Sequence, residues 1–196
     1  MTTPPTSTSA LEASFSELVF SDLERYRPGA RPSWPAVLVR LPTLPGLLAS
    51  LLLRAQQCLH RSGRTFWAHQ LRTLANVLVG VDLGPGMQVG RGFMFAHPVG
   101  VTIGFGLTIG DDVTFAGGVT AAAQYYDEIP AGEEQRWATI GDGAVIGTHA
   151  VLVGGVRIGR RAVVGANSVV LSDVPDGAVV MGSPARRVGT RDQDAP

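Results

Sequence analysis

The sequence predicts a mainly β fold, a left-handed parallel β-helix that follows an N-terminal α-helical cap. From Ile140 to Val170 an aliphatic residue recurs at every sixth position, and glycine follows most of these residues. This period matches neither the helical repeat nor the two-residue alternation of a simple strand. It is typical of a hexapeptide repeat, in which three hexads form one triangular coil and stacked coils pair their strands about 4.8 Å apart. The region before the repeat instead carries apolar segments of helical length, separated by prolines.

The N-terminal part is expected to hold a disordered segment and then a helical region over 11–78 that covers the open first coil. The first ten residues, MTTPPTSTSA, are small and polar and lack the basic start and apolar core of a signal peptide, which predicts disorder over 1–10. The apolar segment 44–53 has about half the length needed to cross a bilayer, so we expect a buried helix there. The predicted helices cover 11–26, 46–60 and 64–77.

The β-helix is expected over 79–189, with a tail over 190–196. Its aliphatic ladder shifts by two residues between Phe95 and Ile103, which implies a two-residue insertion near His97. A prism this narrow cannot bury much core alone, so we expect its faces to be buried against copies of itself in a homotrimer.

The repeat stops again between Thr120 and Ala138, where we expect an extruded loop over 121–139. We expect the ladder to resume at Ile140 in the phase that it had before the loop. Loops that leave a rigid coil are where such a scaffold places chemistry, so this loop and the insertion at His97 are the candidate site. The closing GSPARRVG is expected to fold back at the end of the coils.

Composition limits the classes of partner. The net charge is zero and only 16% of the residues are charged, so nothing indicates a nucleic-acid or membrane partner. The single cysteine, Cys58, rules out an intrachain disulfide and falls in an apolar helical stretch. We therefore expect a buried, reduced thiol in a cytoplasmic protein.

Four motifs carry a resemblance to a known family: VGVDLGPGMQVGRGFMFAHPVGVTIG, the GGVT before the loop, QRWATIGDG after it, and the final GSPARRV. Over residues 21–189 the chain resembles the serine acetyltransferase branch of the hexapeptide acyltransferases. The closing G-x-P-A-R and the spacing from V-D-x-x-P to R-G-x-x-x-x-H are specific to this branch. The resemblance implies a trimer, able to pair with a second trimer through the helical region, that transfers an acetyl or other short acyl group from acyl-CoA in a cleft between two subunits.

The resemblance assigns catalytic roles to His97 and Asp82. Transfer from a thioester to a hydroxyl needs a base that titrates near neutral pH, and unperturbed histidine does so near pH 6.5. His97 matches the family's catalytic histidine, and Asp82 matches the aspartate that orients it through the other ring nitrogen. From the residues alone, a solvated turn histidine and a turn-forming aspartate remain open alternatives.

The resemblance also assigns binding roles. Arg136 matches the arginine that anchors the substrate carboxylate through a bidentate fork. The residues that match the lining of the acetyl-CoA groove are Gly118, Thr120, Thr148, Ala166 and Arg186. Backbone amides near Gly117 and Gly118 are candidate donors to the thioester oxyanion. Each of these residues also fits an ordinary structural role in a coil.

Three positions depart from the family pattern. Ala96 stands where the family has an aspartate that helps hold the substrate's ammonium group. Trp137 and Phe105 stand where the family pairs a second histidine with a glutamate, and their joint replacement by aromatics indicates either a wider, more apolar acceptor pocket or a packing contact between subunits. A retained carboxylate anchor without the ammonium partner predicts an acceptor other than free serine, such as a hydroxy acid, an N-masked amino acid or a carrier-bound one.

Two other functions compete with acyl transfer. A β-helix of this kind also serves zinc carbonic anhydrases, but that site needs three converging histidines and the coil region offers only His97 and His149, so we expect no metal. His60 and His69 fall on the helical cap and are expected to be surface or packing residues. A non-catalytic binding or regulatory partner is favoured by Ala96 and Trp137, whereas Asp82 and His97 argue against it.

Overall fold

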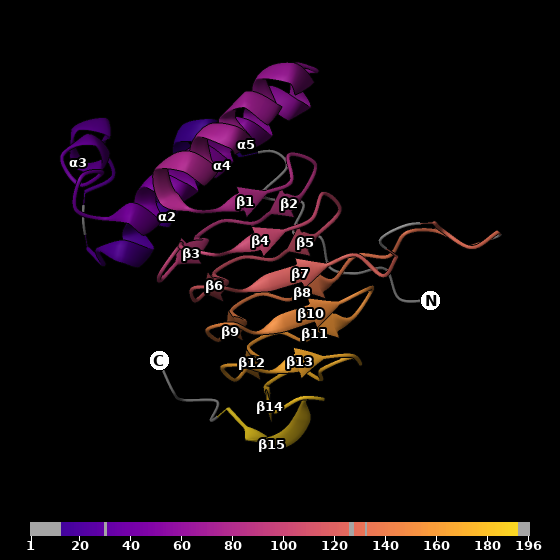
Figure 1. Cartoon of the computed structure of the whole chain (residues 1–196). Coiled ribbons are helices and arrows are strands. Elements are labelled where there is room, and N and C mark those ends of the chain that lie inside the picture. The colour runs from indigo at the N-terminus through magenta and orange to yellow at the C-terminus, as the bar shows by residue number, and fades with distance from the viewer. Residues whose placement is uncertain (1–12, 30, 126–127, 132, 192–196) are drawn as a thin grey trace.

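The computed structural model describes residues 13–29, 31–125, 128–131 and 133–191. Helices lie across one end of a stack of short strands, and a long loop leaves the stack halfway down (Figure 1). The predicted fold class, a parallel β-helix under an N-terminal helical cap, is confirmed by this arrangement. The predicted disordered segment 1–10 and residues 192–196 of the predicted tail lie outside the described residues.

The cap contains four helices among the described residues: α2 (Phe15–Tyr26), α3 (Trp34–Leu38), α4 (Pro45–Arg61) and α5 (Thr65–Val79). Helix α2 begins later than predicted because Ser14 and Glu17 form a capping box, in which the Ser14 N–H donates to the Glu17 carboxylate at 2.7 Å. Helix α3 was not predicted, since five residues are too few to show a helical period. None of the helices in the described ranges is long and apolar enough to cross a membrane.

Cys58 is exposed on α4, so the predicted burial of its thiol was wrong. The helix buries the preceding pair, Gln56 and Gln57, against the first coil and leaves Cys58 on its outer side. An apolar stretch of sequence did not reveal that the face turned toward the coil carries polar side chains.

The strands form three sheets, which are the three faces of the coil. Face A holds β1 (Asp82–Leu83), β4 (Thr102–Ile103), β7 (Thr120–Ala122), β10 (Val151–Val153) and β13 (Val169–Val170). Face B holds β2 (Gln88–Val89), β5 (Thr108–Ile109), β8 (Thr139–Ile140) and β11 (Arg157–Ile158). Face C holds β3 (Met94–Phe95), β6 (Thr114–Phe115), β9 (Val145–Ile146), β12 (Val163–Val164), β14 (Ala178–Met181) and β15 (Arg186–Thr190).

The strands within each face pair in parallel, apart from β15, which folds back antiparallel on β14 as the closing motif predicted. The inward residues of each coil stack on those of the next, so the prism is filled by ladders of buried aliphatic and aromatic side chains. The three aromatic members, Phe93, Phe95 and Phe115, pack edge to face under the cap.

The strand register measures both interruptions of the repeat. Leu83 pairs with Ile103, a step of 103 − 83 = 20 residues against the 158 − 140 = 18 of a regular coil, which confirms the two-residue insertion. Ile109 pairs with Ile140 across the loop, a step of 140 − 109 = 31 residues. The excess of 31 − 18 = 13 residues is not a whole number of hexads, so the predicted return in the same phase was wrong. A loop that leaves the coil need not contain whole hexads, because only its two ends are paired.

An ion pair, buried from solvent, joins the cap to the first coil. The Arg54 guanidinium on α4 donates from Nε and Nη2 to the two carboxylate oxygens of Asp22 on α2, each at 2.9 Å. Arg54 also donates to the Val89 carbonyl at 2.8 Å, and Asp22 accepts the Phe93 N–H at 2.9 Å. Every charged group in this cluster therefore has hydrogen-bond partners, as burial requires.

Other polar side chains of the cap bond to the free edge of the same coil. Gln56 donates to the Leu83 carbonyl at 2.6 Å and Gln57 to the Met87 carbonyl at 3.2 Å. The Tyr26 hydroxyl donates to the Phe95 carbonyl at 3.1 Å and accepts the Phe95 N–H at 2.8 Å, as a neighbouring strand would. Burial raises the pKa of Tyr26, so the hydroxyl keeps the proton that it donates.

We expect Arg54→Met to lower the free energy of unfolding by about 3–5 kcal/mol, because it leaves the Asp22 carboxylate buried without its partner. Denaturant titration at one fixed protein concentration measures the change. Arg160→Met is the matched control, since Arg160 and Asp176 form an exposed pair (63% and 59% side-chain exposure) that should cost less than about 1 kcal/mol. Equal losses for the two variants would contradict a structural role for the buried pair.

Candidate functional site

The chain turns from face C to face A at one corner of the prism, which we call the His97 corner (residues 96–101, 116–119, 147–150, 165–168 and 182–185). His97 lies in its first turn, after β3, and is exposed. A Cβ on Gly117 of the next coil would come within 3.4 Å of the His97 Cβ and 3.2 Å of its carbonyl oxygen. The two coils therefore close tightly at the point where His97 leaves the backbone.

The predicted cofactor residues lie along the same corner. Gly118, Thr148 and Ala166 occupy successive turns, tied by bonds from the His149 N–H to the Gly117 carbonyl and from the Asn167 N–H to the Thr148 carbonyl. Thr148 and Ala166 are exposed, and their small side chains leave room along the corner. The structure thus brings these three residues together with His97.

Two further predicted cofactor residues border this corner. Thr120 lies beside it on face A, paired with Thr102 and Val151. Arg186 is exposed just after its last turn, where the Gly182 N–H donates to the Ser168 hydroxyl at 3.1 Å. Both residues could therefore meet a long ligand that runs down the corner.

The prediction that the Gly118 amide donates to an oxyanion was wrong, because this N–H donates to the Val99 carbonyl at 3.0 Å. Gly118 has φ +69°, and its missing Cβ makes room for the ring of His149 from the coil below. The sequence had offered His149 only as a second coil histidine. In the structure His97 and His149 flank the Gly117–Gly118 turn from opposite sides.

Asp82 begins β1 on face A, next to the His97 corner. Two residues before it, the Gly80 carbonyl accepts the Gly100 N–H at 2.8 Å, and Gly100 belongs to the turn that carries His97. Within the described chain, however, no hydrogen bond joins Asp82 to His97. The Asp82 carboxylate is instead held by Arg72 of α5, which donates to both oxygens, one of them from Nη2 at 2.8 Å.

Sequence analysis missed Arg72. A helical pattern predicts which residues lie on one side of α5, but not which coil residue each of them meets. The hydrogen bond from Asp82 raises the pKa of Arg72, so this side chain stays cationic. The only available signal was Asp82 itself, since a half-buried carboxylate under a cap calls for a cation.

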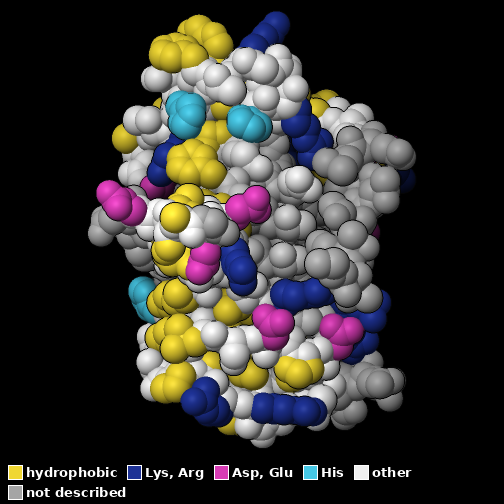
Figure 2. Space-filling model, turned by 90° about the vertical axis from the view of Figure 1, so that its right-hand side faces the viewer, with side chains coloured by type: hydrophobic (Ala, Val, Ile, Leu, Met, Phe, Trp, Pro, Cys, Tyr) yellow, Lys and Arg dark blue, Asp and Glu magenta, His cyan; other side chains and the backbone are white. Residues whose placement is uncertain are grey.

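The predicted acceptor residues lie at a different corner, between faces A and B, which we call the loop corner (residues 84–87, 104–107, 123–138, 154–156 and 171–173). The Trp137 ring packs against Gly104 and Gly106, the two residues that flank Phe105, and a Cβ on either glycine would overlap it. Trp137 and Phe105 therefore adjoin, as their joint replacement in the sequence predicted. Figure 2 shows hydrophobic, histidine and arginine side chains gathered where the cap meets the first coils on this side.

Arg136 is exposed at the same loop corner and packs its side chain over Gly155. With Gln124 it borders a hollow of about 360 Å³. The loop is tied across its base, where the Gln135 amide donates to the Tyr125 carbonyl at 2.6 Å and accepts the Tyr125 N–H at 3.1 Å. Within one chain, face A separates Arg136 from Ala96 and His97.

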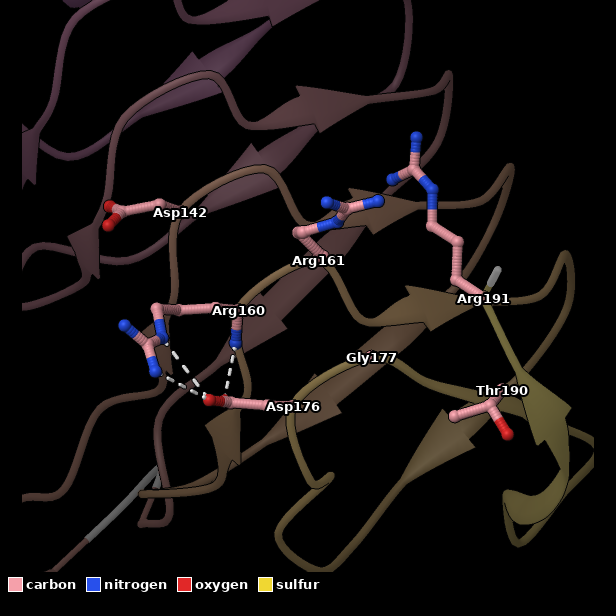
Figure 3. Close-up of a pocket in the computed structure, with 7 residues that line it drawn as sticks. All are labelled: Asp142, Arg160, Arg161, Asp176, Gly177, Thr190 and Arg191. Atoms are coloured by element: carbon pink, nitrogen blue, oxygen red, sulfur yellow. Dashed lines mark hydrogen bonds and ion pairs between the residues drawn. The ribbon is translucent and has the colours of Figure 1, made fainter. Parts of the chain in front are cut away.

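The largest hollow, of about 760 Å³, lies at the third corner, between faces B and C (Figure 3). Arg160 and Asp176 form an ion pair at its edge, and Arg161 and Arg191 extend from neighbouring turns. None of the predicted site residues lines this hollow. Its size therefore does not mark it as the site, and among the described residues no group of three histidine, cysteine, aspartate or glutamate side chains could hold a metal ion.

Comparison with known proteins agrees with the fold and the motifs. Residues 138–172 match the family model described as bacterial transferase hexapeptide (six repeats). The serine acetyltransferase of Helicobacter pylori (strain ATCC 700392 / 26695) is 36% identical over 166 residues, which cover 85% of this chain and 91% of that protein.

Solved structures of the same group are also similar. Soybean serine acetyltransferase complexed with serine has a TM-score of 0.78 and 31% identity, over 92% of this chain and 72% of that one. Serine acetyltransferase from Brucella abortus strain S19 in complex with coenzyme A has a TM-score of 0.77 and 26% identity, over 94% and 72%. With this identity over most of both chains, the protein belongs to the serine acetyltransferase family.

Proposed function

We propose that this protein transfers an acetyl group from acetyl-CoA to the hydroxyl of serine, or of a serine-like acceptor that carries a carboxylate. The observation that carries the proposal is the shared corner of His97, Gly118, Thr148 and Ala166, since the family likeness assigns the first residue to catalysis and the others to the cofactor groove. Solved relatives bound to coenzyme A and to serine support both substrates.

In the proposed step, the His97 imidazole takes the proton of the acceptor hydroxyl as its oxygen attacks the thioester carbonyl carbon. A C–O bond forms and the C–S bond breaks. The departing thiolate takes up the proton that the imidazolium holds, so the products are the O-acetyl ester and CoA. Each proton and electron pair is accounted for without a covalent enzyme intermediate.

The acceptor end of the site is proposed to come from a second copy of the chain. His97 and Arg136 lie at the two edges of face A, so a single chain does not present both to one ligand. In a cyclic trimer, the His97 corner of one chain faces the loop corner of the next. Arg136 of the neighbouring chain would then bind the acceptor carboxylate, with Trp137 and Phe105 beside it.

Burial of the cap against another copy is supported by its outer surface. Helix α5 exposes large apolar side chains, among them Trp67, Leu74 and Leu78, which are 60%, 43% and 56% exposed and recur at helical spacing. A contiguous apolar stripe of this kind marks an interaction surface. We therefore propose that the trimer pairs with a second trimer through the helical cap.

We expect His97→Ala to lower turnover at least about a hundredfold, because the variant lacks the base that accepts the hydroxyl proton. Release of free thiol from acetyl-CoA measures the rate, with serine and a panel of carboxylate-bearing alcohols as acceptors, and mass spectrometry identifies each product. Turnover of serine would identify a serine acetyltransferase, and turnover of another acceptor alone would assign the altered pocket.

His149→Ala is the matched control for this assay, since it removes a histidine from the same corner without removing the proposed base. It should keep most of the activity. Equal turnover by wild type and His97→Ala would exclude His97 as the base. Absence of turnover in the wild type with every acceptor, together with no binding of CoA, would favour a non-catalytic binding protein.

A mixed trimer tests whether two chains share one site. His97→Ala and Arg136→Ala chains, co-expressed with different tags and purified on both, should together recover about one third of wild-type activity, because one of the three sites then keeps both residues. Each variant alone should remain weak. If the mixed trimer is no more active than the separate variants, His97 and Arg136 do not act across a subunit boundary.

A further inference from the structure

The Asp82 carboxylate is held from the cap by Arg72. Arg72 donates from Nε to one carboxylate oxygen and from Nη2 to the other at 2.8 Å, which is the two-pronged geometry that guanidinium favours. The two side chains are 30% and 31% exposed, so the pair is partly shielded from water. Such a fork fixes both the position and the rotation of the carboxylate, which a single hydrogen bond would not do.

Arg72 is itself held from a second side. Its guanidinium carbon lies 5.0 Å from the centre of the Phe105 ring, within the range of a cation–π contact. The turn that carries Phe105 is packed against the Trp137 ring through Gly104 and Gly106. The departure from the family pattern at Phe105 and Trp137 therefore builds a support for Arg72.

Asp82 is also tied to the turn of the proposed base. Its N–H donates to the Val101 carbonyl at 2.9 Å, and the Gly100 N–H donates to Gly80 at 2.8 Å. A carboxylate offers about four acceptor positions, of which Arg72 uses two. The remaining positions allow Asp82 to accept an N–H from the His97 ring while it stays bound to Arg72.

We propose that Arg72 is a positioning residue, which fixes the Asp82 carboxylate and through it orients the His97 imidazole for proton transfer. This inference rests on the proposed function, in which His97 is the base. Arg72 also adds a positive charge behind the carboxylate, which opposes protonation of the imidazole. The base therefore stays neutral, and able to accept a proton, at lower pH than it would beside an unpaired carboxylate.

Other titratable groups face these residues and must be separated from Arg72 in any pH experiment. On α5, the His69 ring lies 6.1 Å from the Phe105 ring. His60 of α4 lies 3.7 Å from the position of a Cβ on Gly86, in the turn after β1. His149 faces His97 across the Gly117–Gly118 turn.

The test compares wild type with Arg72→Gln, which keeps a hydrogen-bond donor and removes the charge. We expect kcat to fall about tenfold or more with KM for acetyl-CoA little changed, since only positioning of the base is lost. We also expect the acid limb of kcat/KM against pH to move up by about half a unit or more. Arg72→Lys should restore the position of the acid limb while recovering only part of kcat, because it returns the charge without the fork.

Arg64→Gln is the matched control, because it removes an exposed arginine at the start of the same helix. Its pH profile should overlie that of wild type. Thermal unfolding of each variant separates loss of fold from loss of positioning. Superimposed acid limbs for wild type and Arg72→Gln would overturn the inference, even where kcat falls.

NMR titration of the histidine rings tests the same inference without turnover. With the His97 signals assigned by His97→Gln, its titration midpoint should move to higher pH in Arg72→Gln and to lower pH in Asp82→Asn. An unchanged midpoint in Arg72→Gln would overturn the inference. A wild type that binds CoA but turns over no acceptor would instead refute the proposed function, so the two failures are distinguishable.

Discussion

The open edge of the first coil is the constraint on which the rest of the molecule depends. A parallel coil ends in unpaired backbone N–H and C=O groups, which must be satisfied when they are covered. In this chain, the side chains of α2 and α4 make those bonds, with the Asp22–Arg54 pair at the centre. Because these contacts are buried and directional, they set the place of the cap on the coil and thereby bring α5 over β1.

The triangular section of the coil then divides the chemistry among its corners. One corner collects His97 and the small residues beside it, and another collects Arg136, Trp137 and Phe105. The third carries the arginine-lined hollow. A rigid prism cannot bend to bring its corners together, so a reaction that needs two of them requires a neighbouring chain. The Arg72–Asp82 pair adds a link from the cap to the corner that carries the base.

Much of the fold could be predicted because the hexad period is a local property. Ile140 to Val170 kept a strict repeat, and the shift between Phe95 and Ile103 revealed the insertion that carries His97. The phase after the loop could not be predicted, since the length of an extruded loop is free. The candidate site was predicted only in its coil residues. Arg72 was missed and Cys58 misplaced because both depend on the rotation of a cap helix, which is set by tertiary contacts.

A crystal structure of the protein with coenzyme A tests the central claim most directly. The account predicts CoA along the His97 corner, with its pantetheine against Gly118, Thr148 and Ala166 and its sulfur within reach of the His97 ring. The same structure should place Arg136 of a neighbouring chain across the cleft. CoA bound instead in the hollow beside Arg160 and Arg161, or a site completed by one chain alone, would contradict the account.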